Sequence, residues 1–157
     1  MVDEIVESGE KVVIFSTFKE PIYELQKALK KYDPLICTGD QTDEEVNASK
    51  QLFQENPDYK VFLGTSQKCG TGITLNAASY MIFIDTSWVY AEFEQACDRI
   101  HRVGTKKPVT IYNLICKDTV DERVYKIINQ KKDISDYLID DKVNNADELK
   151  ALLGVDV

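Results

Sequence analysis

Residues 11–15 read Lys-Val-Val-Ile-Phe, a lysine followed by four apolar side chains. Such a run is typical of a strand buried on both faces of a sheet, because a half-exposed strand would alternate polar and apolar residues. Four further stretches have the same apolar character. We expect a strand in each of them, at residues 35–37, 60–65, 80–85 and 109–115.

Helical patterns separate these strands. Two of the helices have a capping box at their start, in which a threonine and a glutamate three residues later each accept a backbone N–H. The two pairs are Thr17 with Glu20 and Thr42 with Glu45. Further helices are expected over residues 90–103 and after Thr119, which has Glu122 at the same spacing. Residues 1–10 are expected to form a short helix or an ordered lead-in. Alternating strands and helices predict an α/β fold of three layers, with helices on both faces of a mainly parallel sheet.

Ligands of parallel sheets bind beyond the carboxyl ends of the strands. We therefore expect a functional site where the predicted strands end. The residue pairs at those ends are 16–17, 38–39, 65–66, 85–86 and 115–116.

The composition restricts the class of protein. The 157 residues carry a net charge of −8, which argues against tight nucleic-acid binding by this chain alone, because such binding depends on neutralising phosphates. A local basic patch remains at residues 99–107, which hold two arginines and two lysines with no acid. No apolar run is long enough to span a membrane, and the acidic residues 1–4 lack the features of a signal peptide. We expect no membrane partner.

The cysteines give no metal-binding pattern. The chain has four cysteines and one histidine, and no two cysteines have the C-x-x-C spacing of a zinc site. We therefore expect no metal to be bound by this chain alone. Four reduced thiols are expected, in an intracellular, reducing compartment such as the cytoplasm, or the nucleus in a eukaryote.

Residues 95–104, Gln-Ala-Cys-Asp-Arg-Ile-His-Arg-Val-Gly, contain the most distinctive cluster of polar side chains. Arg99 and Arg102 are three residues apart and share a helical face, which also includes Gln95. Two guanidiniums on one face could bind a polyanion such as a triphosphate. The alternative is a solvated helix end, where cations interact favourably with the helix dipole. From these ten residues alone, the two interpretations are about equal.

Three other features each allow a binding role or a structural one. Gly70-Thr71-Gly72 could hold phosphate, but it matches neither the dinucleotide fingerprint nor a Walker A loop, and a tight turn is the commoner role. Asp85 could bind a cation or orient an arginine, or it could simply precede a helix. Trp88 could stack on a base or ribose, or it could pack half-buried.

The combination of these segments is more specific than its parts, and it resembles the second RecA-like lobe of the SWI/SNF-type ATPases of helicase superfamily two. Residues 95–104 resemble motif VI of that family, and Val13 to Ser16 resemble motif IV. Motif V is represented by Thr65, Gly70-Thr71-Gly72-Ile73 and Leu75. Ile84-Asp85 with Trp88, and Asp118 to Glu122, resemble the family's segments before and after motif VI. The order and spacing agree over residues 10–135.

The resemblance implies a RecA-like fold and half of an ATP site. In this family ATP and Mg²⁺ bind between two lobes, and the first lobe brings the Walker A lysine and the acidic motif that handles Mg²⁺. The present chain looks like the second lobe. ATP and Mg²⁺ would therefore need an N-terminal RecA-like lobe, either in the same polypeptide or in trans.

The resemblance also suggests roles for single residues. Arg99 and Arg102 would be arginine fingers on the triphosphate, and Gln95 would be a supporting polar contact. Gly70 and Gly72 would shape the loop at the nucleotide cleft.

The remaining roles concern the strand ends. Asp85 would lie on the nucleotide side, whereas Ser16, Thr65 and Trp88 would face the backbone or groove of double-stranded DNA.

The chain also departs from the family: Val46 replaces an arginine, and Val-Tyr follows Trp88 in place of Asn-Pro. These departures indicate a divergent member, and they affect the DNA contacts more than the arginine fingers.

Two functions follow as expectations. The first is the second motor lobe of an ATP-dependent DNA translocase, a part of an ATP hydrolase that is inactive as an isolated chain. The second is a non-catalytic, free-standing lobe that binds or regulates a partner protein, which the net acidity and the missing Walker A loop favour slightly. A Rossmann-type dinucleotide domain fits the alternation but lacks the glycine fingerprint. We expect the lobe to occupy residues 1–139, followed by an acidic tail or short helix at 140–157.

Overall fold

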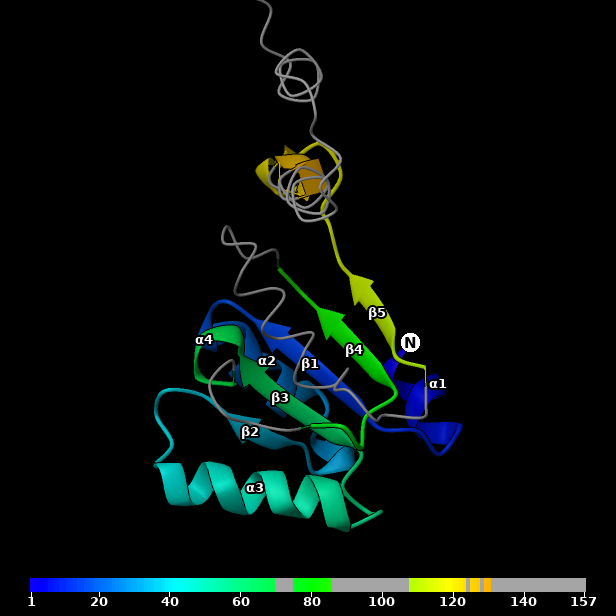
Figure 1. The fold of residues 1–157 in the computed structure, drawn as a ribbon, viewed down its shortest axis with the longest axis vertical. Coiled ribbons are helices and arrows are strands. Elements are labelled where there is room, and N and C mark those ends of the chain that lie inside the picture. Colours follow the sequence, from blue (N-terminus) through cyan, green and yellow to red (C-terminus); the bar gives the residue numbers. More distant parts are fainter. Residues whose placement is uncertain (70–74, 86–107, 124, 128, 131–157) are drawn as a thin grey trace, which may run out of the picture.

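The computed structural model describes residues 1–69, 75–85, 108–123, 125–127 and 129–130. These residues form one five-stranded sheet with the strand order β2-β3-β1-β4-β5, and every pairing in it is parallel (Figure 1). The strands are β1 (Val12–Ser16), β2 (Leu35–Cys37), β3 (Val61–Thr65), β4 (Tyr80–Phe83) and β5 (Thr110–Asn113). All five strands expected from the sequence are present, so the predicted parallel sheet is confirmed.

Helices cover both faces of the sheet. On one face, α1 (Val2–Glu7) and α2 (Lys19–Ala28) bury Ile5, Val6 and Ile22 against alternate strand residues such as Ile14. On the other face, α3 (Asp43–Glu55) and the one-turn helix α4 (Ser66–Cys69) bury Val46, Phe53 and Cys69 against the intervening residues, such as Phe15. The three layers of the predicted α/β fold are therefore confirmed.

The central strands are buried on both faces, as their apolar sequences predicted. Every residue of β1 and of β3 is buried, and the two strands pair in register from Val12 with Val61 to Ser16 with Thr65. Because both strands run in the same direction, Ser16 and Thr65 emerge side by side at the carboxyl edge.

Helix α3 begins with the predicted capping box. The backbone N–H of Glu45 donates to Thr42 Oγ1 at 3.3 Å, and the N–H of Thr42 donates to Glu45 Oε2 at 2.7 Å. At the other end of α3, Lys11 Nζ donates to the carbonyl oxygens of Phe53 and Asn56. Side chains therefore bind some of the free backbone groups at each end of the helix.

The predicted capping box at Thr17 and Glu20 is wrong. Helix α2 begins at Lys19, and its N-cap is Phe18, which gives no side-chain hydrogen bond. The N–H of Thr17 instead donates to Asp85 Oδ1, at 2.7 Å. The spacing was right for a capping box, but a carboxylate from a distant strand end holds this turn.

The helix expected after Thr119 does begin there, but its N-terminal hydrogen bonds are each one residue away from those of a Thr119–Glu122 capping box. Residues 120–123 are helical, and Thr119 Oγ1 accepts the N–H of Asp121 at 3.3 Å. Glu122 Oε2 accepts the N–H of Asp118, not that of Thr119, at 3.3 Å. Residues 66–69 form the short helix α4.

The structure tests the remaining predictions only in part. Cys37 and Cys69 are buried free thiols, whereas Cys116 is exposed. Among the described residues, no helix is long and apolar enough to cross a membrane. The expected helix at 90–103 and the domain boundary at residue 139 lie outside the described residues, so they stay predictions.

Candidate functional site

Three of the residues predicted to bind ligands lie together at the carboxyl edge of the sheet. Ser16 ends β1 and pairs with Thr65, which ends β3. On the other side of β1, the N–H of Ile84 donates to the carbonyl oxygen of Phe15 at 3.0 Å, so the pairing with β4 continues to the end of β1. Asp85 follows directly, and the parallel sheet thus brings together residues that are up to 69 positions apart.

Asp85 is bonded to the end of β1. Its Oδ2 atom accepts the hydroxyl hydrogen of Ser16, and its Oδ1 atom accepts the N–H of Thr17 at 2.7 Å. The Ser16 hydroxyl oxygen in turn accepts the N–H of Phe18 at 3.0 Å. With only 1% of its surface exposed, Ser16 makes these contacts inside the protein. In this arrangement both polar side chains bind protein atoms.

The end of β3 is also buried. Thr65 is 7% exposed, and the hydroxyl of the next residue, Ser66, has no hydrogen-bond partner in the described structure. A buried hydroxyl without a partner is unusual, because its desolvation is not compensated. Sequence reasoning did not single out Ser66, since only its position after a strand end marked it.

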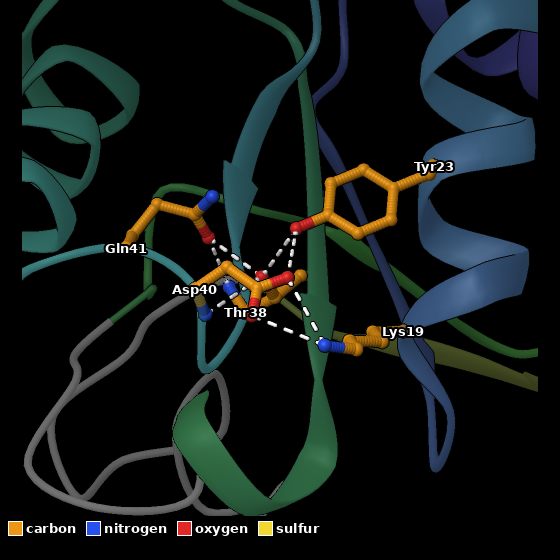
Figure 2. Close-up of polar contacts among 5 residues, drawn as sticks. All are labelled: Lys19, Tyr23, Thr38, Asp40 and Gln41. Carbon is orange, nitrogen blue, oxygen red and sulfur yellow. Dashed lines mark hydrogen bonds and ion pairs between the residues drawn. The ribbon is translucent and has the colours of Figure 1, made fainter.

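A polar cluster of five residues surrounds the end of β2 (Figure 2). The Tyr23 hydroxyl lies 3.0 Å from Thr38 Oγ1 and donates to Asp40 Oδ2 at 2.7 Å. Thr38 Oγ1 and the Thr38 N–H both donate to Gln41 Oε1, at 2.8 and 2.6 Å. Lys19 Nζ completes the cluster with an ion pair to Asp40, at 3.1 Å. These contacts join the start of α2 to the loop after β2.

The two charged side chains of this cluster, Lys19 and Asp40, neutralise each other. The pKa of Asp40 is held below its ordinary value, first by the Tyr23 hydroxyl and then by Lys19. The pKa of Lys19 is raised in return by its bond to Asp40. Lys68 is likewise paired with Asp43, at 2.7 Å. Sequence reasoning missed Lys19, Tyr23 and Gln41, because only the strand end at Thr38 marked this place.

The described residues do not form an ATP or magnesium site by themselves. Asp85 is the one residue of the predicted nucleotide set that the structure describes, and its two oxygens already accept protein hydrogen bonds, so the carboxylate does not fit a free Mg²⁺ ligand. No group of three or more metal-binding side chains occurs in the described part of the chain. The remaining residues lie outside it: Gly70, Gly72, Trp88, Gln95, Arg99 and Arg102.

Comparison with known families decides the relationship. Residues 1–104 match the family described as the helicase conserved C-terminal domain. The chain belongs to this helicase C-terminal domain family. The matched range includes both arginines of residues 95–104 as well as the strand ends at Ser16, Thr65 and Asp85.

Individual relatives agree with this assignment. The chain is 35% identical to an uncharacterized ATP-dependent helicase of Mycoplasma genitalium, MG018, over 90% of this chain and 14% of the relative. It is 34% identical to the human chromatin-remodeling ATPase INO80, over 90% of this chain and 9% of the relative. It is 38% identical to the bovine DNA excision repair protein ERCC-6-like, over 76% of this chain and 10% of the relative. The chain therefore spans only a small part of the length of these relatives.

A solved structure supports the fold. The crystal structure of the C-terminal part of the Fun30 ATPase domain matches with a TM-score of 0.73 and 33% identity, over 79% of this chain and 41% of that one. Together with the sequence relatives, this match confirms the resemblance to the C-terminal RecA-like lobe of SWI/SNF-type ATPases.

Proposed function

We propose that this chain is the second motor lobe of an ATP-dependent DNA translocase. Arg99 and Arg102 would act as arginine fingers on ATP that an N-terminal RecA-like lobe binds, with Gln95 and the Gly70–Gly72 loop beside them. The observation that carries the proposal is the family match, which includes both arginines. The segment that contains them begins in sequence directly after Asp85, at the edge of the sheet where parallel α/β domains bind ligands.

ATP with Mg²⁺ would supply the phosphoryl group that is transferred to water. Guanidinium groups stabilise the negative charge that develops on this group in the transition state. Arginine fingers contribute a factor of about 10³–10⁵ in rate in other nucleotide hydrolases. The benefit depends on closure of the two lobes, which would couple hydrolysis to movement along DNA.

Double-stranded DNA is the proposed track. Support comes from the names of the relatives, which include a DNA excision repair protein and a chromatin-remodeling ATPase. The family resemblance suggests Ser16, Thr65 and Trp88 as contact positions. Because Ser16 and Thr65 are buried, their hydroxyls have little access to DNA in this arrangement. The net charge of −8 requires that the basic residues at 99–107 and the other lobe supply most of the attraction to phosphate.

The test is Arg102→Ala in the polypeptide that carries both lobes. We expect DNA-stimulated ATP turnover to fall by a factor of about 10³ or more, with an unchanged melting temperature. Arg123→Ala is the matched control, because Arg123 is an exposed arginine outside residues 95–104. Near-normal turnover in the Arg102 variant would refute the arginine-finger role.

The alternative is a non-catalytic lobe that acts on a partner protein, which the net acidity favours. The two functions differ in what the full polypeptide contains. A Walker A loop and an Asp-Glu motif upstream of residue 1 in the same reading frame would favour the motor. The isolated chain is expected to lack ATPase activity, and robust magnesium-dependent hydrolysis by it would contradict both functions. Either function fits an intracellular, reducing compartment, the cytoplasm or the nucleus.

A further inference from the structure

We propose that Ser16 and Asp85 are positioning residues: they fix the start of the chain segment that carries the arginines, and they do not themselves bind ligand. This inference rests on the proposed function. It assigns to Ser16 and Asp85 a different role from the DNA contact and nucleotide contact that the family resemblance suggests. The geometry at the ends of β1 and β4 is the basis for it.

The end of β4 is held from two directions. Its backbone is held by the bond from the Ile84 N–H to the Phe15 carbonyl, 3.0 Å long. One residue later, the Asp85 side chain reaches across the end of β1 and accepts hydrogen bonds from Ser16 Oγ and from the Thr17 N–H. The chain direction at residue 85 is therefore set both by the sheet and by a carboxylate.

The same carboxylate also sets the entry to α2. Ser16 Oγ donates to Asp85 and accepts from the N–H of Phe18, the N-cap of α2. A carboxylate suits this place because the two groups facing it are both donors. An asparagine at position 85 would turn an NH₂ group toward one of these donors, so that one hydrogen bond would be lost.

The consequence for catalysis follows from the sequence order. Arg99 and Arg102 belong to residues 86–107, which follow Asp85 and precede Pro108 in sequence. Small errors in the position of a group that stabilises a transition state lower turnover strongly. Loss of positioning would reduce kcat and leave KM for ATP nearly unchanged, because the affected interaction is strongest in the transition state.

A matched control pair lies at the opposite end of the same two strands. Ser79, which precedes β4, is buried and its hydroxyl donates to the carboxylate of Glu10, which precedes β1. This pair also joins β1 to β4 and also spans 69 residues of sequence, but it lies at the amino edge. Its loss should affect stability in the same way as loss of Ser16–Asp85, without affecting the catalytic edge.

The experiment measures ATP turnover by the full two-lobe ATPase with DNA present. The variants are Ser16→Ala, Asp85→Asn and the double variant, with Ser79→Ala and Glu10→Gln as controls. We expect each Ser16 or Asp85 variant to lower kcat roughly tenfold with less than about a twofold change in KM for ATP. The double variant should be no slower than the slower single variant, since both remove one interaction. The controls should keep wild-type kcat.

The conservative variant Ser16→Thr keeps the hydroxyl, so its kcat should stay near the wild-type value, in contrast to that of Ser16→Ala. If Asp85→Asn does not fold, the comparison of Ser16→Ala with Ser16→Thr decides the question, because only loss of the hydroxyl should lower kcat. A raised KM in Asp85→Asn with normal Ser16→Ala would instead show that Asp85 binds nucleotide or metal. A weakened DNA dependence in Ser16→Ala with normal Asp85→Asn would show a direct DNA contact. Either result overturns the inference, as do equal losses of kcat in the control pair.

The failure of this inference is distinguishable from the failure of the proposed function. If Arg102→Ala keeps normal turnover, the proposed function fails. If Arg102→Ala is inactive while Ser16→Ala and Asp85→Asn turn over normally, only the positioning role fails.

Discussion

The Sγ atom of Cys69 occupies the space that a side chain on Gly64 would fill. An ideal Cβ atom at position 64 would lie 2.3 Å from this sulfur, 3.4 Å from the carbonyl oxygen of Cys37 and 3.5 Å from the ring of Phe15. Cys69 is fully buried, and burial raises the pKa of its thiol, so a neutral sulfur packs directly on the β3 backbone. Position 64 therefore requires glycine for reasons of space.

Gly64→Ala should destabilise the protein by about 1–3 kcal/mol, because an added methyl group has to displace buried atoms. The midpoint of urea unfolding measures the effect. Gly39→Ala is the matched control, since a Cβ at position 39 would meet no atom within 4 Å. Adding Cys69→Ala to Gly64→Ala should recover part of the loss by removing the sulfur. Wild-type stability of the Gly64 variant would show that the sulfur moves aside at little cost.

Lys11→Met should destabilise the protein by about 1.5–3 kcal/mol, the usual contribution of hydrogen bonds to a charged group. Lys11 Nζ donates to the carbonyl oxygens of Phe53 and Asn56 at the end of α3, and it lies 5.1 Å from the centre of the Phe53 ring. Methionine keeps the apolar stem and removes the donors. Lys60→Met is the control, because Lys60 gives one longer bond of 3.3 Å to Val6. Equal losses of stability in both variants would mean that removal of the positive charge, and not of the hydrogen bonds, destabilises the protein.

Phe18→Ser should stabilise the isolated chain slightly, by about 0.5 kcal/mol, at the low end of the usual N-cap effect. Phe18 is the N-cap of α2, gives no capping bond and is 60% exposed, so little buried surface is lost. The gain is small because Pro21, the third helical residue, has no N–H to be capped. Thermal unfolding measures the difference, with Thr42→Ala as a reference that removes an existing cap and should cost about 1 kcal/mol. A destabilised Phe18 variant would contradict this expectation.

Asp40→Asn should destabilise the protein at pH 7, and the difference from wild type should shrink on acidification. The Tyr23 hydroxyl and Lys19 hold the pKa of Asp40 below its value in the unfolded chain. The stabilising contribution is therefore complete above the unfolded pKa of about 3.9 and is lost as pH falls through the lower folded pKa.

Urea midpoints of wild type and Asp40→Asn between pH 7 and pH 3 check this prediction. The exposed Asp58→Asn variant controls for the loss of one negative charge. A difference in urea midpoint between wild type and Asp40→Asn that grows toward low pH would contradict this prediction.

Much of the fold follows from local sequence patterns. The apolar runs at 11–15 and 60–65 predict strands that the structure shows as β1 and β3, because continuous apolar runs need burial on both faces. The Thr42–Glu45 spacing predicts the start of α3, since both capping partners lie within one turn. The family relationship could also be predicted, because the motifs over residues 10–135 keep their order.

The tertiary structure alone decides how the strand ends are used. The Thr17–Glu20 spacing equals that of Thr42–Glu45, yet Thr17 is bonded to Asp85 instead. The reason is the strand order. Because β4 lies beside β1, the carboxylate of Asp85, which follows β4, reaches the turn after β1 and takes the place of the capping box that local spacing predicts there. For the same reason, the sequence marks Ser16 and Asp85 as strand ends, and only the parallel packing of β1 and β4 makes them partners.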